Sequence, residues 1–149
     1  MNTEALEPRD PAYEAKVRDS FARQPLMATL GATLTRVEPG LVHVALPYRA
    51  DLCQQNGFLH AGAVASVADS ACGYAAFTLS APETDVLAVE FKISLLAPAH
   101  GERFEARARV LRSGRTLSNV LAEVFAIEAG RETAVAAMLS TIVIRSRRD

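Results

Sequence analysis

The sequence predicts an α+β fold in which a curved antiparallel sheet wraps around one long buried helix. The first observation is the run of Ala, Val, Ser and Gly at residues 60–79, which is almost uncharged and has the length of a helix. The second is the alternation of apolar and polar residues in the segments after it, which is typical of strands. One helix cannot cover both faces of a broad flat sheet, so we expect the sheet to curve around it.

The other elements follow in chain order from caps, turns and periodicity. A helix is expected over residues 10–24, because Asp10-Pro11 is a helix-start signal and Pro25 interrupts the pattern. Turns are expected at Pro39-Gly40, Ser113-Gly114 and Ala129-Gly130. Strands are expected at residues 30–37, 41–48, 89–95, 103–110, 117–127 and 134–144.

The composition excludes several classes of function. The chain has 149 residues with 16 basic and 17 acidic side chains, a balance that argues against broad binding to nucleic acid. Its start lacks the features of a signal peptide, and no stretch is apolar enough to span a membrane. Neither the two cysteines nor the three histidines have the spacing of a disulfide framework or a metal site. We therefore expect a cytoplasmic protein without a metal.

Residues 54–69 carry the strongest functional signal. They read QQNGFLHAGAVASVAD and place a carboxylate inside an otherwise apolar helix, where a lone Asp is costly to bury unless it has partners or a role. The segment resembles the signature of hotdog-fold acyl-CoA thioesterases of the phenylacetate-pathway (PaaI-like) type. Ala61 departs from the pattern, because it stands where the first Gly of a His-Gly-Gly triplet is usual. The matching positions are Gln54, Gly57, His60, Gly62 and Asp69.

We expect an N-terminal helical extension at residues 1–24, and the resemblance implies a single hotdog thioesterase domain at residues 25–149. It implies that Asp69 attacks the thioester carbonyl or activates a water molecule that does so. The alternative is an ordinary helical Asp that faces solvent or bonds to the hydroxyl of Ser66 or Ser70. Cys72, one turn later, is expected to be a buried inert thiol that could line the pocket.

The start of the helix and the loop before it supply the other catalytic candidates. N–H groups of Ala61 and Gly62 at the helix N-terminus would hold the oxyanion, although Gly62 could equally serve close packing. Gln54 would orient the nucleophile or the water, with Asn56 as a rival. His60 would brace the loop or help to hold the thioester.

The resemblance implies that the hairpin of Arg112, Ser113, Gly114 and Arg115 binds the phosphates of coenzyme A, and guanidinium groups suit phosphates. The alternative is an ordinary charged hairpin tip. Lys92 is a further phosphate candidate. Ala88 aligns with a position where relatives often carry Ser or Thr, so a hydroxyl that could position water is missing there.

The expected function is hydrolysis of acyl-CoA thioesters with a small aromatic or a short- to medium-chain acyl group. No separate cofactor is expected, since coenzyme A is part of the substrate. The resemblance also implies a homodimer or a dimer of dimers, with each site shared between two chains. The alternatives are a hotdog hydratase or dehydratase and a non-catalytic acyl-CoA binding or sensor domain.

Overall fold

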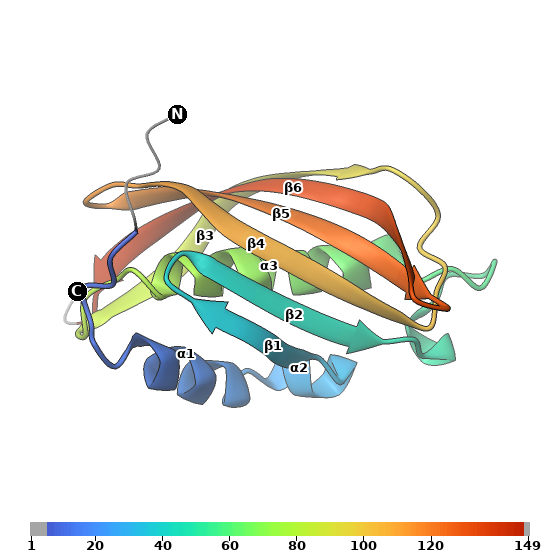
Figure 1. Cartoon of the computed structure of the whole chain (residues 1–149), viewed down its shortest axis with the longest axis horizontal. Helices are drawn as coiled ribbons and strands as arrows, with labels where there is room; N and C mark the ends of the chain where they lie inside the picture. The colour runs from blue at the N-terminus through green and yellow to red at the C-terminus, as the bar shows by residue number, and fades with distance from the viewer. Residues whose placement is uncertain (1–5, 148–149) are drawn as a thin grey trace.

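The computed structural model describes residues 6–147, and it confirms the predicted α+β hotdog fold. Within these residues, six strands form one antiparallel sheet in the order β1-β2-β4-β5-β6-β3. Figure 1 shows this sheet bending across the long helix α3 (Ala61–Phe77), which lies behind it in that view. The strands are β1 (Thr33–Glu38), β2 (Leu41–Pro47), β3 (Thr84–Leu95), β4 (Arg103–Ser113), β5 (Leu117–Glu128) and β6 (Arg131–Ser146).

Small side chains allow the sheet to wrap closely around α3. Strand pairing places a row of buried residues across β2, β4, β5 and β6, and the row includes two alanines. The helix meets the sheet with further small or branched residues that are fully buried. Close approach of helix and sheet buries apolar surface, which is the main stabilising term in folding. The row is Val44, Ala106, Val124 and Ala136, and the helical residues include Val67, Ala68 and Ala71.

The N-terminal region differs from the prediction in two ways. Helix α1 (Tyr13–Ala22) begins at Tyr13 rather than at Pro11, because the Asp10 carboxylate accepts a hydrogen bond from the Ala12 N–H (2.9 Å) in a turn before the helix. Pro25 does not lead to a strand but starts a short second helix, α2 (Pro25–Leu30). Pro is well suited to the first position of a helix because it has no N–H to leave unpaired.

The edge strand β3 is longer than predicted. It begins at Thr84, five residues before the expected start at Val89, and pairs along its whole length with β6. An irregularity between Ala88 and Glu90 shifts the pairing register, so the alternation of apolar and polar residues breaks at that point. The free edge of β3 exposes large apolar side chains, including Leu87, Val89 and Phe91.

Helix α1 is fastened to the C-terminal end of α3 by one lysine. The Lys16 Nζ donates to the carbonyl oxygens of Ser80 (3.0 Å) and Ala81 (3.3 Å) and forms an ion pair with Asp10 (3.3 Å). It also lies 4.6 Å from the centroid of the Phe77 ring. These contacts hold α1 beside the end of α3, and Gln24, after α1, reaches Ser70 next to Asp69. None of the helices within residues 6–147 is long and apolar enough to cross a membrane.

Candidate active site

Asp69 lies beside a cavity of about 240 Å³ between α3, α1 and β3. Its Oδ1 atom is buried and has no hydrogen-bond partner within residues 6–147. The hydroxyl of Ser66 donates instead to the Gly62 carbonyl (2.7 Å), and that of Ser70 donates to Gln24 Oε1 (3.2 Å). The alternative in which a neighbouring hydroxyl binds Asp69 is therefore wrong, and Asp69 lines the cavity without a hydroxyl partner.

Burial raises the pKa of Asp69 above the ordinary value of 3.8, because a desolvated carboxylate is harder to ionise. A carboxylate with a raised pKa is a stronger base, which suits it to remove a proton near neutral pH. Burial, together with the charge of Asp69, also raises the pKa of the Cys72 thiol to about 12. Cys72 is thus a buried, un-ionised thiol, in agreement with the prediction.

The N-terminus of α3 corrects the expectation for Gly62. His60 caps the helix, and its Nδ1 accepts the hydrogen bond of the Gly62 N–H (2.8 Å). A Cβ atom at residue 62 would lie 3.0 Å from that nitrogen, so glycine makes room for the imidazole. The N–H of Gly62 is therefore occupied by the cap and is not open to an oxyanion in this structure. His60 braces this helix start, which is one of the two roles expected for it.

Ala61 and Gln54 line a second cavity, of about 450 Å³, which is otherwise largely apolar. Within residues 6–147 the N–H of Ala61 has no hydrogen-bond partner, as expected for the first residue of a helix. The Gln54 Oε1 accepts from the Asn56 N–H, and this bond closes a turn in which Gly57 adopts a φ of +82°. Gln54 lines the cavity, whereas Asn56 is exposed and does not. The position of Gln54 beside Ala61 favours it over its rival.

One chain does not bring Asp69 and Ala61 together. Eight residues of helix separate them, which corresponds to about 12 Å along the axis of α3. They also open into different cavities, Asp69 into the one beside α1 and Ala61 into the one beside Gln54. The proposed base and the proposed oxyanion donor of a single chain are therefore too far apart to act on one carbonyl.

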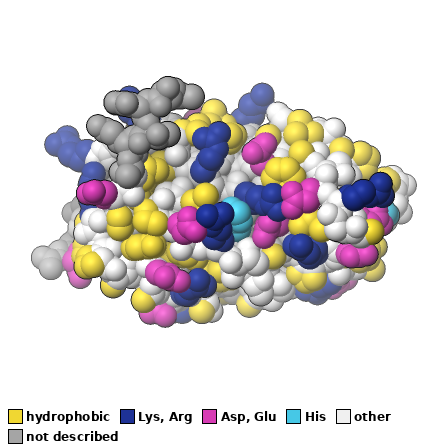
Figure 2. Space-filling model, viewed as in Figure 1, with side chains coloured by type: hydrophobic (Ala, Val, Ile, Leu, Met, Phe, Trp, Pro, Cys, Tyr) yellow, Lys and Arg dark blue, Asp and Glu magenta, His cyan; other side chains and the backbone are white. Residues whose placement is uncertain are grey.

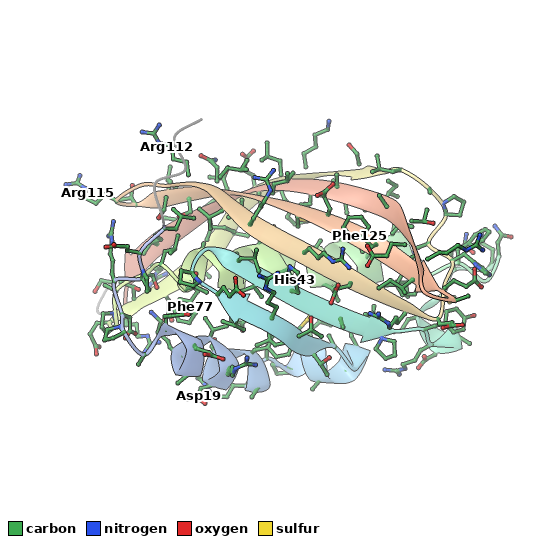
Figure 3. The ribbon with its side chains drawn as sticks, viewed as in Figure 1. Asp19, His43, Phe77, Arg112, Arg115 and Phe125 are labelled. Carbon is green, nitrogen blue, oxygen red and sulfur yellow. The ribbon has the colours of Figure 1, made fainter. Side chains whose placement is uncertain are left out.

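The predicted phosphate-binding hairpin joins β4 and β5 at the end of the molecule opposite the start of α3 (Figure 1). Arg112 and Arg115 are exposed and project from this tip in Figure 3. Neither forms an ion pair with the part of the chain that the structure describes. Ser113 accepts from the Ser118 hydroxyl (3.3 Å), and the Gly114 N–H donates to Leu117 (2.7 Å), so these two residues shape the turn.

Lys92, the further phosphate candidate, lies apart from this hairpin. Its side chain is exposed in the middle of β3, opposite Leu139 of β6. The structure thus brings together the two arginines and separates the lysine from them.

Several charged side chains on the face of the sheet turned away from α3 are paired with one another. Figure 2 shows basic and acidic side chains alternating in a band across it, with a histidine at the centre. Arg36 pairs with Glu38 (2.8 Å), and Arg107 pairs with Glu105 (2.7 Å) and with Glu132. In residues 6–147 no group of three or more His, Cys, Asp or Glu side chains is placed to hold a metal ion. The candidate catalytic residues Asp69, Ala61 and Gln54 line the two cavities beside α3.

Sequence reasoning did not assign Ser20, Gln24 or Asp85 to the site, although all three line the cavity beside Asp69. The first two come from the end of α1 and the turn after it, far from Asp69 along the chain. No local pattern distinguishes these two residues. Gln24, for example, is a polar residue just before a proline, which is typical of an ordinary helix end. Only the packing of α1 against α3 brings them to the carboxylate.

Known proteins share this architecture. The model of the thioesterase superfamily matches residues 56–141, which is more than half of the chain. The chain belongs to the thioesterase superfamily. The expected enzyme class, a thioester hydrolase, is thereby confirmed.

Individual relatives agree with this assignment. A thioesterase family protein from Silicibacter pomeroyi has a crystal structure that is similar with a TM-score of 0.89 and 54% identity, covering 90% of this chain and 98% of that one. A protein from Saccharolobus solfataricus described as a candidate esterase is 26% identical over 88% of this chain and 85% of its own length. The E. coli PaaI protein of the phenylacetic acid degradation operon shares the fold, with a TM-score of 0.82 and 17% identity over 93% and 96% of the two chains.

Proposed function

We propose that this protein hydrolyses acyl-CoA thioesters, with Asp69 as the nucleophile or general base. Two observations carry the proposal: Asp69 lines a cavity, and its buried Oδ1 has no hydrogen-bond partner in residues 6–147. As a base, the carboxylate takes a proton from water while the water oxygen attacks the thioester carbonyl. As a nucleophile, it forms an acyl anhydride that water then cleaves. In both cases the coenzyme A thiolate leaves and the acid is released.

The Ala61 N–H is the proposed donor to the oxyanion that forms on the carbonyl oxygen. A backbone N–H at a helix N-terminus is fixed in direction and lies at the positive end of the helix dipole. His60 occupies the Gly62 N–H, which leaves Ala61 as the donor at this site. Gln54, beside it in the same cavity, is proposed to orient the water or the carboxylate.

We propose that each complete site forms between two copies of the chain. The free edge of β3 exposes apolar side chains that a second β3 could cover by antiparallel pairing. A twofold axis at that edge would place the start of α3 from one chain near Asp69 of the other. The same rotation would bring the Arg112 hairpin of one chain toward the partner's helix start, because these two features lie at opposite ends of one chain. The assembly is a homodimer or a dimer of dimers.

Arg112 and Arg115 are proposed to bind the phosphates of coenzyme A, with Lys92 as a further contact. The cavity volumes of about 240 and 450 Å³ suit a small aromatic or a short- to medium-chain acyl group better than a long one. The PaaI-like resemblance favours the aromatic choice. A coenzyme A substrate also agrees with the expected cytoplasmic location.

The test is thioester turnover by the purified protein. Release of free thiol is measured with a series of aromatic and straight-chain acyl-CoAs, for the wild type and for Asp69→Asn. Turnover that depends on Asp69 supports the proposal. Tight binding of acyl-CoA without turnover would identify the sensor alternative instead. Equal turnover by the wild type and by Asp69→Asn would show that Asp69 is not the catalytic residue.

A further inference from the structure

The cavity beside Asp69 contains an amide that the reaction described above does not use. Gln24 lies at the turn between α1 and α2, and its side chain reaches the same cavity as Asp69 and Ala88. Ala88 offers no hydroxyl from β3, so this strand contributes no side-chain donor at that position. A side-chain hydrogen-bond donor comes instead from Gln24, in the turn between α1 and α2.

The orientation of the Gln24 side chain is set by Ser70. The Ser70 hydroxyl donates to Gln24 Oε1 (3.2 Å), and Ser70 is buried directly after Asp69 in the helix. With its oxygen held in this way, the carboxamide leaves its NH₂ group without a partner in residues 6–147. An NH₂ group facing an ionised carboxylate is favourable, whereas the reverse orientation would set two oxygens against each other.

The other polar side chains at this cavity have hydrogen-bond or ion-pair partners. The Ser20 hydroxyl is paired with the Tyr74 hydroxyl (3.3 Å), and burial raises the pKa of the Tyr74 phenol. Asp85 forms an ion pair with Arg147 (Nε to Oδ1, 3.2 Å). The Ser20–Tyr74 bond uses one of the two hydroxyl hydrogens, so among residues 6–147 the cavity has two donors left, one of these hydroxyls and the Gln24 NH₂. Of the two, Gln24 is the one bonded to Ser70, the residue next to Asp69.

We propose that Gln24 holds the hydrolytic water against Asp69 by donating a hydrogen bond from its NH₂ group. This rests on the proposed function of Asp69, but it assigns the water-binding role to the N-terminal helices rather than to β3. The water is needed whether Asp69 acts as a base or as a nucleophile, because an acyl anhydride must also be hydrolysed. Ser70 becomes a positioning residue, since it fixes the amide that touches the water.

The experiment uses two variants of the full chain. Gln24→Met keeps the length of the side chain without the amide, and Gln24→Glu places a second carboxylate in the cavity. Asp19→Asn is the matched control, because Figure 3 shows Asp19 on the outer side of α1, the helix before Gln24, and away from the sheet. For each protein, kcat and KM are measured over a pH series, and the Asp69 carboxyl is titrated by ¹³C NMR. Thermal unfolding confirms that each variant is folded.

We expect Gln24→Met to lower kcat about 10- to 100-fold and to change KM by less than about twofold, because a misplaced water slows the chemical step without weakening binding. The titration of Asp69 should move up by about half a unit to one unit in Gln24→Met, since a donor to the charged form is lost. Gln24→Glu should move it further, because a like charge opposes ionisation. Asp19→Asn should leave both quantities unchanged.

An unchanged kcat and an unchanged Asp69 titration in a folded Gln24→Met protein would overturn the proposal. A change in KM or in acyl-chain preference with the same kcat would also overturn it, because Gln24 would then be a wall of the acyl pocket. If the wild type shows no thioester turnover, the proposed function fails, but the NMR titration still decides whether Gln24 acts on Asp69.

Discussion

Replacing Asp69 by Asn should remove activity and stabilise the fold at the same time. Asparagine has nearly the same shape, so the cavity and the core around α3 are preserved. It lacks the charge that attacks or activates water, and loss of such a group lowers kcat by about 10³-fold, equivalent to about 4 kcal/mol of transition-state stabilisation. The same change removes a carboxylate that is buried without a partner in the described part of the chain.

The stability gain follows from the raised pKa of Asp69. Below its ordinary value of 3.8 the carboxyl is protonated in both the folded and the unfolded chain, so its charge costs nothing. As the pH rises from 3.8 through the raised folded-state pKa, the unfolded state loses its proton more readily and the folded state is penalised. Above that pKa the penalty is constant. For a partly buried, unpaired oxygen we estimate about 1 kcal/mol, or a shift in Tm of about 2–4 °C.

Thermal unfolding at several pH values between 4.5 and 8 tests this estimate, and thiol release at pH 7.5 tests the loss of activity. Tm of Asp69→Asn should exceed that of the wild type by a margin that grows with pH and then levels off. The exposed Asp19→Asn substitution is the control and should show no such margin. Asp69 would not be an uncompensated active-site carboxylate if the variant were folded, fully active and no more stable than the wild type.

Other predictions follow from the same contacts. Arg112→Ala and Arg115→Ala should raise KM for acyl-CoA and not for acyl-pantetheine, which lacks the nucleotide; equal loss on both substrates would contradict phosphate binding. Mixing Asp69→Asn with Gln54→Ala should restore up to about half of wild-type activity per mixed dimer, because one of the two shared sites is then intact. Subunit exchange is confirmed by mass spectrometry. If exchange occurs and no activity returns, the shared site is refuted. Lys16→Met should lower the free energy of unfolding by about 1–3 kcal/mol in urea titrations, because it removes the bonds to the segment after α3 and the ion pair with Asp10. An unchanged value would show that the other contacts of α1 are enough to hold it.

The fold was predictable because its pattern is local. Two patterns are visible in the sequence alone: the uncharged run at residues 60–79 and the alternation of apolar and polar residues after residue 100. They correspond to α3 and to β4, β5 and β6. Two segments were assigned wrongly, the one after Pro25 and the start of β3, because the local sequence pattern there fits more than one structure. Pro25 can end one helix or begin another, and the register shift in β3 interrupts the alternation that would have shown its start at Thr84.

The candidate site was predictable only as far as one continuous motif reaches. Residues 54–69 contain Gln54, Ala61 and Asp69 at the spacing of the resemblance, and this spacing directed attention to both ends of the site. The cap by His60 was not visible, because it depends on the side-chain rotamer that brings Nδ1 to the Gly62 N–H. Gln24 was not visible either, because only tertiary packing brings it to Asp69.

The length of α3 connects these observations. In α3 the proposed oxyanion donor, Ala61, is in the first turn, and the proposed base, Asp69, comes eight positions later. The two are therefore about 12 Å apart along the helix, so a single chain contains two incomplete halves of a site. The two halves have different support: the start of α3 depends on the His60 cap and the Gln54 turn, whereas Asp69 depends on α1, held by Lys16, and on Gln24. A change in α1 should therefore affect the base and its water, whereas a change in the Gln54 turn should affect the oxyanion donor. In an assembly that joins the halves from two chains, these defects would fall on different partners, and this difference makes the mixed-dimer experiment decisive.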